Sequence, residues 1–182
     1  MFNFIRNKIK DFSIRYLIFL EIEAFFFTLI GYIPTRVGML LRWFLIKIFF
    51  KKSRGFQYIK TNVIFEHADR ITIGRNVGIN CNCYINGFGG LEMGDYVLLG
   101  ASITITTGVH PVKNRNEPVF FQRSIPKKTI IEDDVWIGSN SVILPGITLR
   151  KGTVIGANSV VTKDTDEYGI YGGVPAKKIG ER

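Results

Sequence analysis

The side chain best suited to chemistry in this sequence is His110, one of two histidines in the chain. It directly precedes Pro111 and the irregular segment 112–118, which reads VKNRNEP. A turn at this point would expose the imidazole beside a loop, where functional residues are common. An imidazole gains and loses a proton near neutral pH, so His110 is either a general base or a plain solvated turn residue.

The other potentially reactive side chains are weaker candidates for a catalytic or metal-binding role. His67 lies in the polar sequence FEHAD, and we expect it at the surface or in a subunit contact. Cys83 falls at an inward corner position of the repeat described below and is expected to be a small core residue. Two histidines cannot supply the three imidazole ligands of a γ-class carbonic anhydrase zinc site, so that class is excluded and no metal is expected.

Apolar residues recur every six positions through most of the chain. The members of this series are Ile73, Ile79 and Ile85, then Met93, Leu99 and Ile105, then Ile131, Ile137, Ile143, Leu149, Ile155 and Val161. A period of six matches neither a helix nor a half-buried strand and is typical of a hexapeptide repeat with one short strand and one turn per unit. Such units bury their apolar face only by stacking on each other, at a strand spacing of about 4.8 Å. An ordinary sandwich of short strands would not keep this phase.

The repeat is interrupted twice. A two-residue slip near Gly87–Gly90 predicts a looped-out corner. A longer interruption, from Pro111 to Lys128, separates Ile105 from Ile131 and begins immediately after His110. The element that positions the imidazole is therefore a loop that leaves a regular scaffold.

Four motifs make the sequence similar to a known family. They are TTGVHP (106–111), WIGSNSVILPGITL (136–149), GANSVVTKD (156–164) and GVPAKKI (173–179). On these motifs, residues 59–180 resemble the left-handed β-helix acyltransferases of the hexapeptide-repeat superfamily, in particular the galactoside, maltose and capsular-polysaccharide O-acetyltransferases. The resemblance implies a left-handed parallel β-helix, acetyl-CoA as acyl donor, and a homotrimer with its coenzyme sites between neighbouring prisms. It also implies that His110 takes the proton of the acceptor hydroxyl, which then attacks the thioester with no acyl-enzyme.

The same resemblance assigns binding roles. Asn80 precedes His110 by thirty residues, the offset of an acceptor-binding Asn in galactoside acetyltransferases, although it could equally be a polar turn residue. In the family's WIGS motif the N–H at the Ser139 position faces the thioester oxygen, whereas Trp136 could equally be a packing aromatic. The basic tail would meet the nucleotide phosphates, and the family often has Arg there. The expected coenzyme-binding residues are Trp136, Ser139, Ala157, Thr162, Lys163, Lys177 and Lys178.

The N-terminal part differs from the repeat, and we divide the chain into a helical segment, 1–52, and a β-helix domain, 53–182. Residues 16–33 are apolar apart from Glu21 and Glu23, and a helix of this length is barely long enough to span a membrane. The two glutamates would place a charge on two different sides of that helix, which opposes a span. A second helix is expected over an amphipathic stripe of Val37, Leu40, Leu41, Phe44, Leu45, Ile48 and Phe49. We expect an α-helical hairpin that lies on a membrane surface, and the alternative is a hairpin that packs on the β-helix or within an oligomer.

Charge supports the membrane interpretation. The net charge is +9, and residues 1–52 carry nine basic and three acidic side chains. A basic excess can indicate nucleic acid, anionic lipid or anionic ligands. No nucleic-acid motif is present. We therefore assign the excess positive charge of residues 1–52 to contact with lipid headgroups, and the remaining excess to binding of a phosphate-bearing coenzyme.

The sequence as a whole predicts an acetyl-CoA-dependent O-acetyltransferase. We expect it to act on a sugar hydroxyl of a lipid-linked oligosaccharide or polysaccharide precursor at the cytoplasmic face of the inner membrane. Acetylation of a small soluble sugar is the alternative, and a non-catalytic structural β-helix is a weaker one. Serine acetyltransferases and amino-sugar N-acetyltransferases are further enzyme classes to consider. The serine enzymes use a second catalytic carboxylate, and we identify no residue in this sequence for that role.

Overall fold

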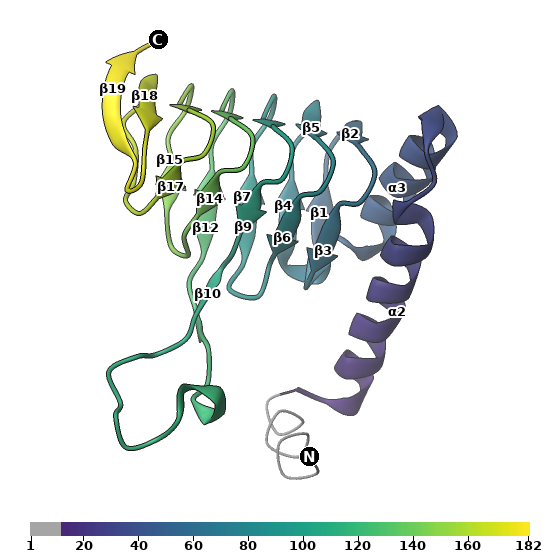
Figure 1. The fold of residues 1–182 in the computed structure, drawn as a ribbon. Coiled ribbons are helices and arrows are strands. Elements are labelled where there is room, and N and C mark those ends of the chain that lie inside the picture. The colour runs from purple at the N-terminus through teal and green to yellow at the C-terminus, as the bar shows by residue number, and fades with distance from the viewer. Residues whose placement is uncertain (1–11) are drawn as a thin grey trace.

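Three parallel sheets form the faces of a prism in the computed structural model, which describes residues 12–182 (Figure 1). Sheet A contains β1 (Lys52–Ser53), β4 (Ile71–Ile73), β7 (Leu91–Met93), β12 (Thr129–Ile131) and β15 (Thr148–Leu149). Sheet B contains β2 (Gln57–Ile59), β5 (Val77–Ile79), β8 (Leu98–Leu99), β13 (Trp136–Ile137), β16 (Val154–Ile155), β18 (Gly169–Gly172) and β19 (Lys177–Glu181). Sheet C contains β3 (Ile64–Glu66), β6 (Tyr84–Asn86), β9 (Thr104–Ile105), β14 (Val142–Ile143) and β17 (Val160–Val161). The chain visits A, B and C in turn, so each coil has an AB, a BC and a CA edge.

The period of six sets the interior. All twelve residues of the apolar series are at most 3% exposed. Each stacks on its counterpart in the next coil, as Ile79 does on Leu99 and Ile137 on Ile155. The predicted core of stacked coils is confirmed.

The corners explain the polar residues of the repeat. At the BC edge, one residue per coil has a positive φ near 60°. These residues are Asn62, Asn82, Ser102, Asn140 and Asn158. Asn tolerates this left-handed conformation better than most side chains, so the corners favour it.

Both predicted interruptions appear as departures from the prism. Residues 87–90 form a tight turn at the CA edge, closed by a hydrogen bond of 2.8 Å from the Gly90 N–H to the Gly87 carbonyl. The longer one is an arm that projects from the CA edge of the prism (Figure 1). Its base is a two-stranded antiparallel ladder of β10 (Gly108–Val109) and β11 (Ile125–Pro126), and its tip carries the short helix η2 (Val119–Phe121).

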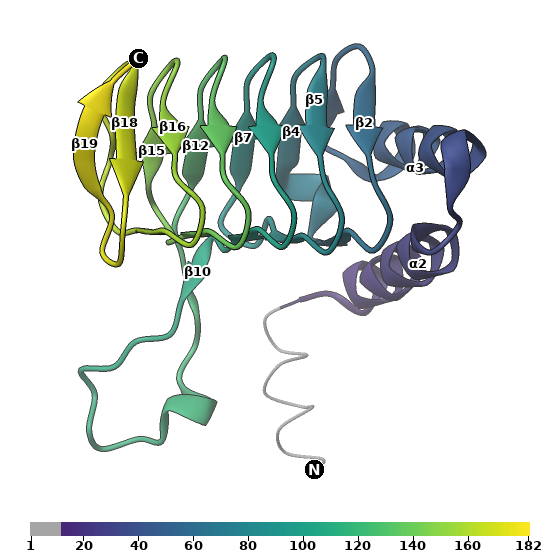
Figure 2. The same cartoon turned by 45° about the horizontal axis from the view of Figure 1, so that its top comes forward.

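The N-terminal helices form a hairpin over one end of the prism (Figure 2). They are α2 (Ile14–Gly31) and α3 (Thr35–Phe49), and they pack on the first coil, which begins at β1. Arg42, which is 3% exposed, donates hydrogen bonds to the carbonyls of Ile30, Ile33 and Ile59 at 3.1, 2.9 and 3.0 Å. It thereby ties the end of α2, the loop and strand β2 together.

A buried carboxylate makes the second attachment. Glu23 is 2% exposed and accepts a hydrogen bond of 3.1 Å from the Ala68 N–H in the short helix η1 (Ala68–Arg70). Burial raises the pKa of Glu23 to about 7, because the charged form loses its hydration. Glu21, two residues earlier, is exposed.

The other end of the prism is closed by an antiparallel hairpin of β18 and β19. The sequence predicts a basic tail here, and the structure shows that this tail is a strand of sheet B. Lys178 in β19 forms ion pairs of 3.1 Å with Asp166 and 2.8 Å with Glu181.

Candidate active site

His110 stands where the arm leaves the prism. It follows β10 directly and is exposed, as predicted for a residue that must reach a substrate. The Ser124 hydroxyl on the returning strand lies 3.4 Å from both ring nitrogens, which is a side-on contact and not a short hydrogen bond. One hydroxyl can hydrogen-bond only one of the two ring nitrogens at a time, so at least one nitrogen remains available to a ligand.

The base of the arm is rigidly anchored. Thr107 is fully buried, and its hydroxyl accepts from the Gly89 N–H at 2.7 Å and donates to the Asn86 carbonyl at 2.9 Å. A Cβ on Gly108 would meet the ring of Phe88 at 2.9 Å, so glycine lets the arm pass close over this aromatic. The arm therefore presents His110 from a fixed point.

The arm is also braced at its tip. Gln122 is 7% exposed, and its side-chain amide donates to the carbonyls of Asn114 and Glu117 at 2.9 and 2.6 Å. These bonds close the loop on itself, while Phe120 and Phe121 remain exposed.

Asn80 lies at the BC edge, at the start of the corner after β5. Its side-chain oxygen accepts a hydrogen bond of 2.9 Å from the Cys81 N–H, and the residue is exposed. Ser139 and Ala157 occupy the same edge in later coils, because each follows a sheet B strand. The structure thus brings three of the predicted residues to one edge of the prism.

The geometry of this edge agrees with a binding role. A Cβ on Gly138 would meet the backbone nitrogen of Ala157 at 2.5 Å, so successive corners can stack this closely only with glycine there. The Ser139 hydroxyl accepts from the Ala101 N–H at 3.1 Å. Among the residues that the structure describes, the N–H of Ser139 has no acceptor, which leaves it available to a ligand.

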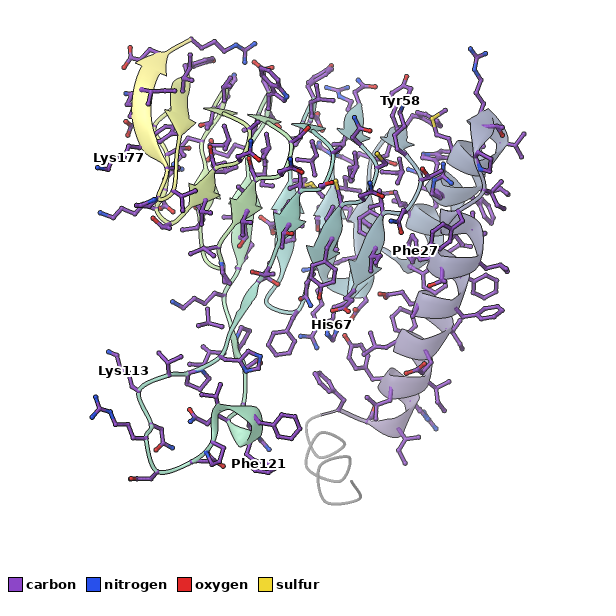
Figure 3. The ribbon with its side chains drawn as sticks, viewed as in Figure 1. Phe27, Tyr58, His67, Lys113, Phe121 and Lys177 are labelled. Atoms are coloured by element: carbon purple, nitrogen blue, oxygen red, sulfur yellow. The ribbon has the colours of Figure 1, made fainter. Side chains whose placement is uncertain are left out.

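The remaining predicted coenzyme residues lie on other parts of the surface. Trp136 is 51% exposed on the outer face of sheet B. Thr162 and Lys163 follow β17 and are exposed at the CA edge, the edge from which the arm leaves. Lys177 and Lys178 are exposed in β19, and Figure 3 shows Lys177 at the far end of the prism from the helices. One chain therefore distributes the predicted residues over two edges, the outer face of sheet B and the terminal strand β19.

The sequence missed the environment of His67. This residue is half-buried, not at the surface, and its ring nitrogen Nδ1 lies 3.0 Å from the Tyr16 hydroxyl, which donates to Asp69 at 3.0 Å. Burial lowers the pKa of His67. The ring lies 5.5 Å from that of Phe88, on the side of the prism between α2 and the arm (Figure 3). The residues next to His67 in the sequence do not indicate this packing, because Tyr16 and Phe88 lie 51 and 21 positions away.

Within residues 12–182, no group of three or more His, Cys, Asp or Glu side chains is arranged to hold a metal ion. The exposed imidazole, the free N–H at a glycine-lined corner and the basic residues near both edges suit a reaction that moves a proton and accommodates a developing negative charge.

Comparison with known proteins agrees with this geometry. Residues 128–163 match the family model described as the hexapeptide repeat of succinyl-transferase. The galactoside O-acetyltransferase of Escherichia coli is 36% identical over 137 residues, which are 75% of this chain and 66% of that protein. The chain spans between 34% and 66% of the length of such curated relatives.

Solved structures match over more of their length. A hexapeptide-repeat acetyltransferase of Vibrio cholerae in complex with acetyl-CoA superposes with a TM-score of 0.82 at 28% identity, covering 93% of this chain and 90% of that one. A galactoside acetyltransferase in complex with coenzyme A gives a TM-score of 0.75 at 31% identity, covering 89% and 82%. The predicted left-handed parallel β-helix with a helical N-terminal hairpin is thereby confirmed, and the chain belongs to the hexapeptide-repeat acetyltransferase family.

Proposed function

We propose that this protein transfers the acetyl group of acetyl-CoA to a hydroxyl of a sugar, with His110 as general base. The observation that carries the proposal is the exposed imidazole at the fixed base of the arm, in a chain whose relatives are named galactoside O-acetyltransferases and whose structural neighbours hold acetyl-CoA or coenzyme A. No second proton-transfer residue is needed for this chemistry.

In the proposed reaction His110 takes the proton of the acceptor hydroxyl while that oxygen attacks the thioester carbon. The new C–O bond forms as the C–S bond breaks, and the leaving thiolate receives the proton from the imidazolium. The free N–H of Ser139 would donate to the carbonyl oxygen as negative charge develops there. A single donor of this kind contributes on the order of 10²–10³ in rate in other acyl-transfer enzymes.

A complete site requires more than one chain under this proposal. A face of the prism is about six residues wide, so its edges are separated by roughly 15–20 Å at about 3.3 Å per residue. Asn80, Ser139 and Ala157 lie at the BC edge, whereas His110, Thr162 and Lys163 lie at the CA edge. A neighbouring prism could bring its CA edge to the BC edge of the first.

The outer faces of the prism support the homotrimer. The outward column on sheet B consists of Tyr58, Gly78, Leu98, Trp136, Val154 and Ile170. One outward column on sheet C consists of Ile64, Tyr84, Thr104, Val142 and Val160, and Glu66 and Asn86 lie on the same face nearer the CA edge. Sheet A instead presents the more polar set Lys52, Thr72, Glu92, Ile130 and Thr148. Apolar sheets B and C would be buried against neighbouring copies, and sheet A would face solvent.

We further propose that the acceptor is met at a membrane surface, at the cytoplasmic face of the inner membrane. The hairpin buries one side on the prism and exposes an apolar stripe on each helix: Ile14, Ile18, Ile22, Phe25 and Leu29 on α2, and Val37, Leu40, Leu41, Phe44 and Ile48 on α3. Arg15, Arg36 and Lys47 are exposed on the same helices. Apolar stripes with basic neighbours favour the interface of an anionic bilayer.

Neither helix within the described part of the chain is both long and apolar enough to cross a bilayer.

Acetyl transfer is tested directly with purified full-length protein. Released coenzyme A thiol is measured with acetyl-CoA and a panel of glycolipid and soluble sugar acceptors, and the product is checked for a mass gain of about 42 daltons, one acetyl group. Turnover on lipid-linked acceptors supports the whole proposal. Turnover on soluble galactosides alone would keep the acetyltransferase and overturn the membrane acceptor, and no turnover with any acceptor would overturn both.

A further inference from the structure

A cavity of about 480 Å³ opens on sheet A beside the base of the arm. Its charged lining residues are Lys51, Asp69, Arg70, Glu92 and Lys128. Phe88, Gly89, Leu91 and Pro126 also line it. None of the residues that the sequence predicts for the site lines this cavity.

The charges of the cavity are not balanced. The Glu92 carboxylate is paired with Lys128 at 2.7 Å. The Asp69 carboxylate accepts from the Tyr16 hydroxyl and lies 3.9 Å from Arg70. For Lys51, no carboxylate of the described residues lies within ion-pair distance, so the cavity carries an excess positive charge.

The guanidinium of Arg70 is fixed in an orientation that suits anion binding. Its guanidinium donates to the Phe88 carbonyl at 2.7 Å and lies 5.4 Å from the centre of the Tyr16 ring and 5.7 Å from that of Phe88. These contacts fix the planar group, whose ion pair with Asp69 is long, at 3.9 Å. A guanidinium held in this way loses little conformational entropy when it binds a phosphate.

The cavity lies between the two parts of the proposed acceptor path. Pro126 in its wall pairs with Gly108 in the ladder at the base of the arm, two residues before His110. Lys51, on the opposite side, follows the last residue of α3 by two positions. An acceptor that extends from the hairpin to His110 would pass over these cations.

We propose that this cavity binds the phosphate or pyrophosphate group of the acceptor, so that the substrate is a phosphorylated or phosphate-linked sugar. The inference rests on the proposed acetyl transfer and specifies its acceptor. The group could belong to a lipid carrier or to a soluble sugar phosphate, because both present the same oxygens to Lys51 and Arg70.

The test is calorimetric titration of full-length protein, first with coenzyme A and then, at saturating coenzyme A, with inorganic pyrophosphate or geranyl pyrophosphate. Filling the coenzyme site first prevents the probes from binding there. Lys51→Gln should weaken both probes about tenfold, since it removes one charge-assisted contact. Glu92→Gln should tighten both probes about threefold or more, because it removes a negative charge and frees Lys128. Lys60→Gln, which removes an equal charge from an exposed site outside the cavity, should change neither.

Each outcome decides one point. Probe binding that is absent, or that is equal in wild type, Lys51→Gln and Glu92→Gln, overturns the phosphate site, whether or not coenzyme A binds. Absent coenzyme A binding overturns the proposed acetyl transfer, and the probes are then titrated alone to decide the cavity. If the site holds, tighter binding of geranyl pyrophosphate than of inorganic pyrophosphate identifies a lipid-linked acceptor, whereas equal affinity identifies a soluble one.

Discussion

Asn80 and His110 lie at different edges of the same prism. Asn80 follows β5 at the BC edge, and His110 follows β10 at the CA edge one coil later. Two residues that are thirty positions apart and are both expected at one acceptor site thus belong to opposite margins of sheet C. The simplest assembly that joins them uses the Asn80 of one copy and the His110 of another.

This arrangement predicts complementation between inactive variants. We expect Asn80→Ala and His110→Ala to be poorly active alone, and a co-refolded mixture to recover a clear fraction of wild-type turnover. In mixed oligomers some sites combine the intact His110 of one chain with the intact Asn80 of the other. A mixture no more active than its two components would contradict the shared site.

His110 itself should control turnover and not coenzyme binding. We expect His110→Ala to lower kcat by about 10²–10⁴, the usual contribution of a positioned general base, with the affinity for coenzyme A unchanged. His67→Ala is the matched control, because it removes the other imidazole, whose ring packs against those of Phe12 and Phe88. A kcat of His110→Ala equal to that of wild type would show that His110 is not the general base.

Much of this architecture follows from the sequence, because a six-residue period specifies both inward residues and corners. Ile105 and Ile131 could be placed in adjacent coils despite the arm between them. Each belongs to a series of apolar residues that are spaced six positions apart on its own side of the arm. The partners of single polar residues could not be predicted in this way. Nothing in the sequence distinguishes Glu21 from Glu23, yet only Glu23 meets the Ala68 N–H, because that depends on how α2 docks on a distant coil.

Local sequence was also insufficient at the C-terminus and at His67. Lys178 reads as a solvated tail residue, but the antiparallel pairing of β18 and β19 brings it to Asp166 and Glu181. The polar neighbours of His67 suggested a surface residue, whereas Tyr16 from α2 covers it. In both places a contact between segments far apart in the chain decided the environment.

Arg42 should be the most costly charged residue of the hairpin to remove. We expect Arg42→Met to lower the free energy of unfolding by about 3 kcal/mol, because the carbonyls of Ile30, Ile33 and Ile59 would lose a charged donor in a buried site. Arg36→Met, on the exposed side of the same helix, should change it by less than about 0.5 kcal/mol. Denaturant unfolding of the two variants measures the difference, and equal stabilities would show that Arg42 does not hold the hairpin.

Glu23 should make stability depend on pH. Its pKa in the folded protein is about 7, above the value near 4.5 of the unfolded chain, so the folded state holds the proton more tightly. The resulting stabilisation is complete below about pH 4.5 and is lost as the pH rises through 7. We expect the stability of wild type relative to Glu23→Gln to fall by up to about 3 kcal/mol between pH 5 and pH 8.

Glu21→Gln provides the control for this pH dependence, because Glu21 is exposed on the same helix. Its free energy of unfolding should follow the wild-type pH profile. A Glu23→Gln profile parallel to wild type would show that the buried carboxylate does not titrate in this range.

The apolar stripe of α3 should control vesicle binding. Phe44 and Ile48 are 58% and 57% exposed, so burying both in a bilayer would contribute about 2–3 kcal/mol. We therefore expect Phe44→Ser/Ile48→Ser to reduce binding to vesicles that contain anionic phosphatidylglycerol by at least about tenfold in a flotation assay. Val174→Ser/Ile179→Ser removes two apolar side chains that are 71% and 69% exposed at the opposite end of the prism, and it should leave binding unchanged. If the α3 stripe instead covers another subunit, the Phe44→Ser/Ile48→Ser variant will change its oligomeric mass in light scattering while binding to vesicles stays at the wild-type level.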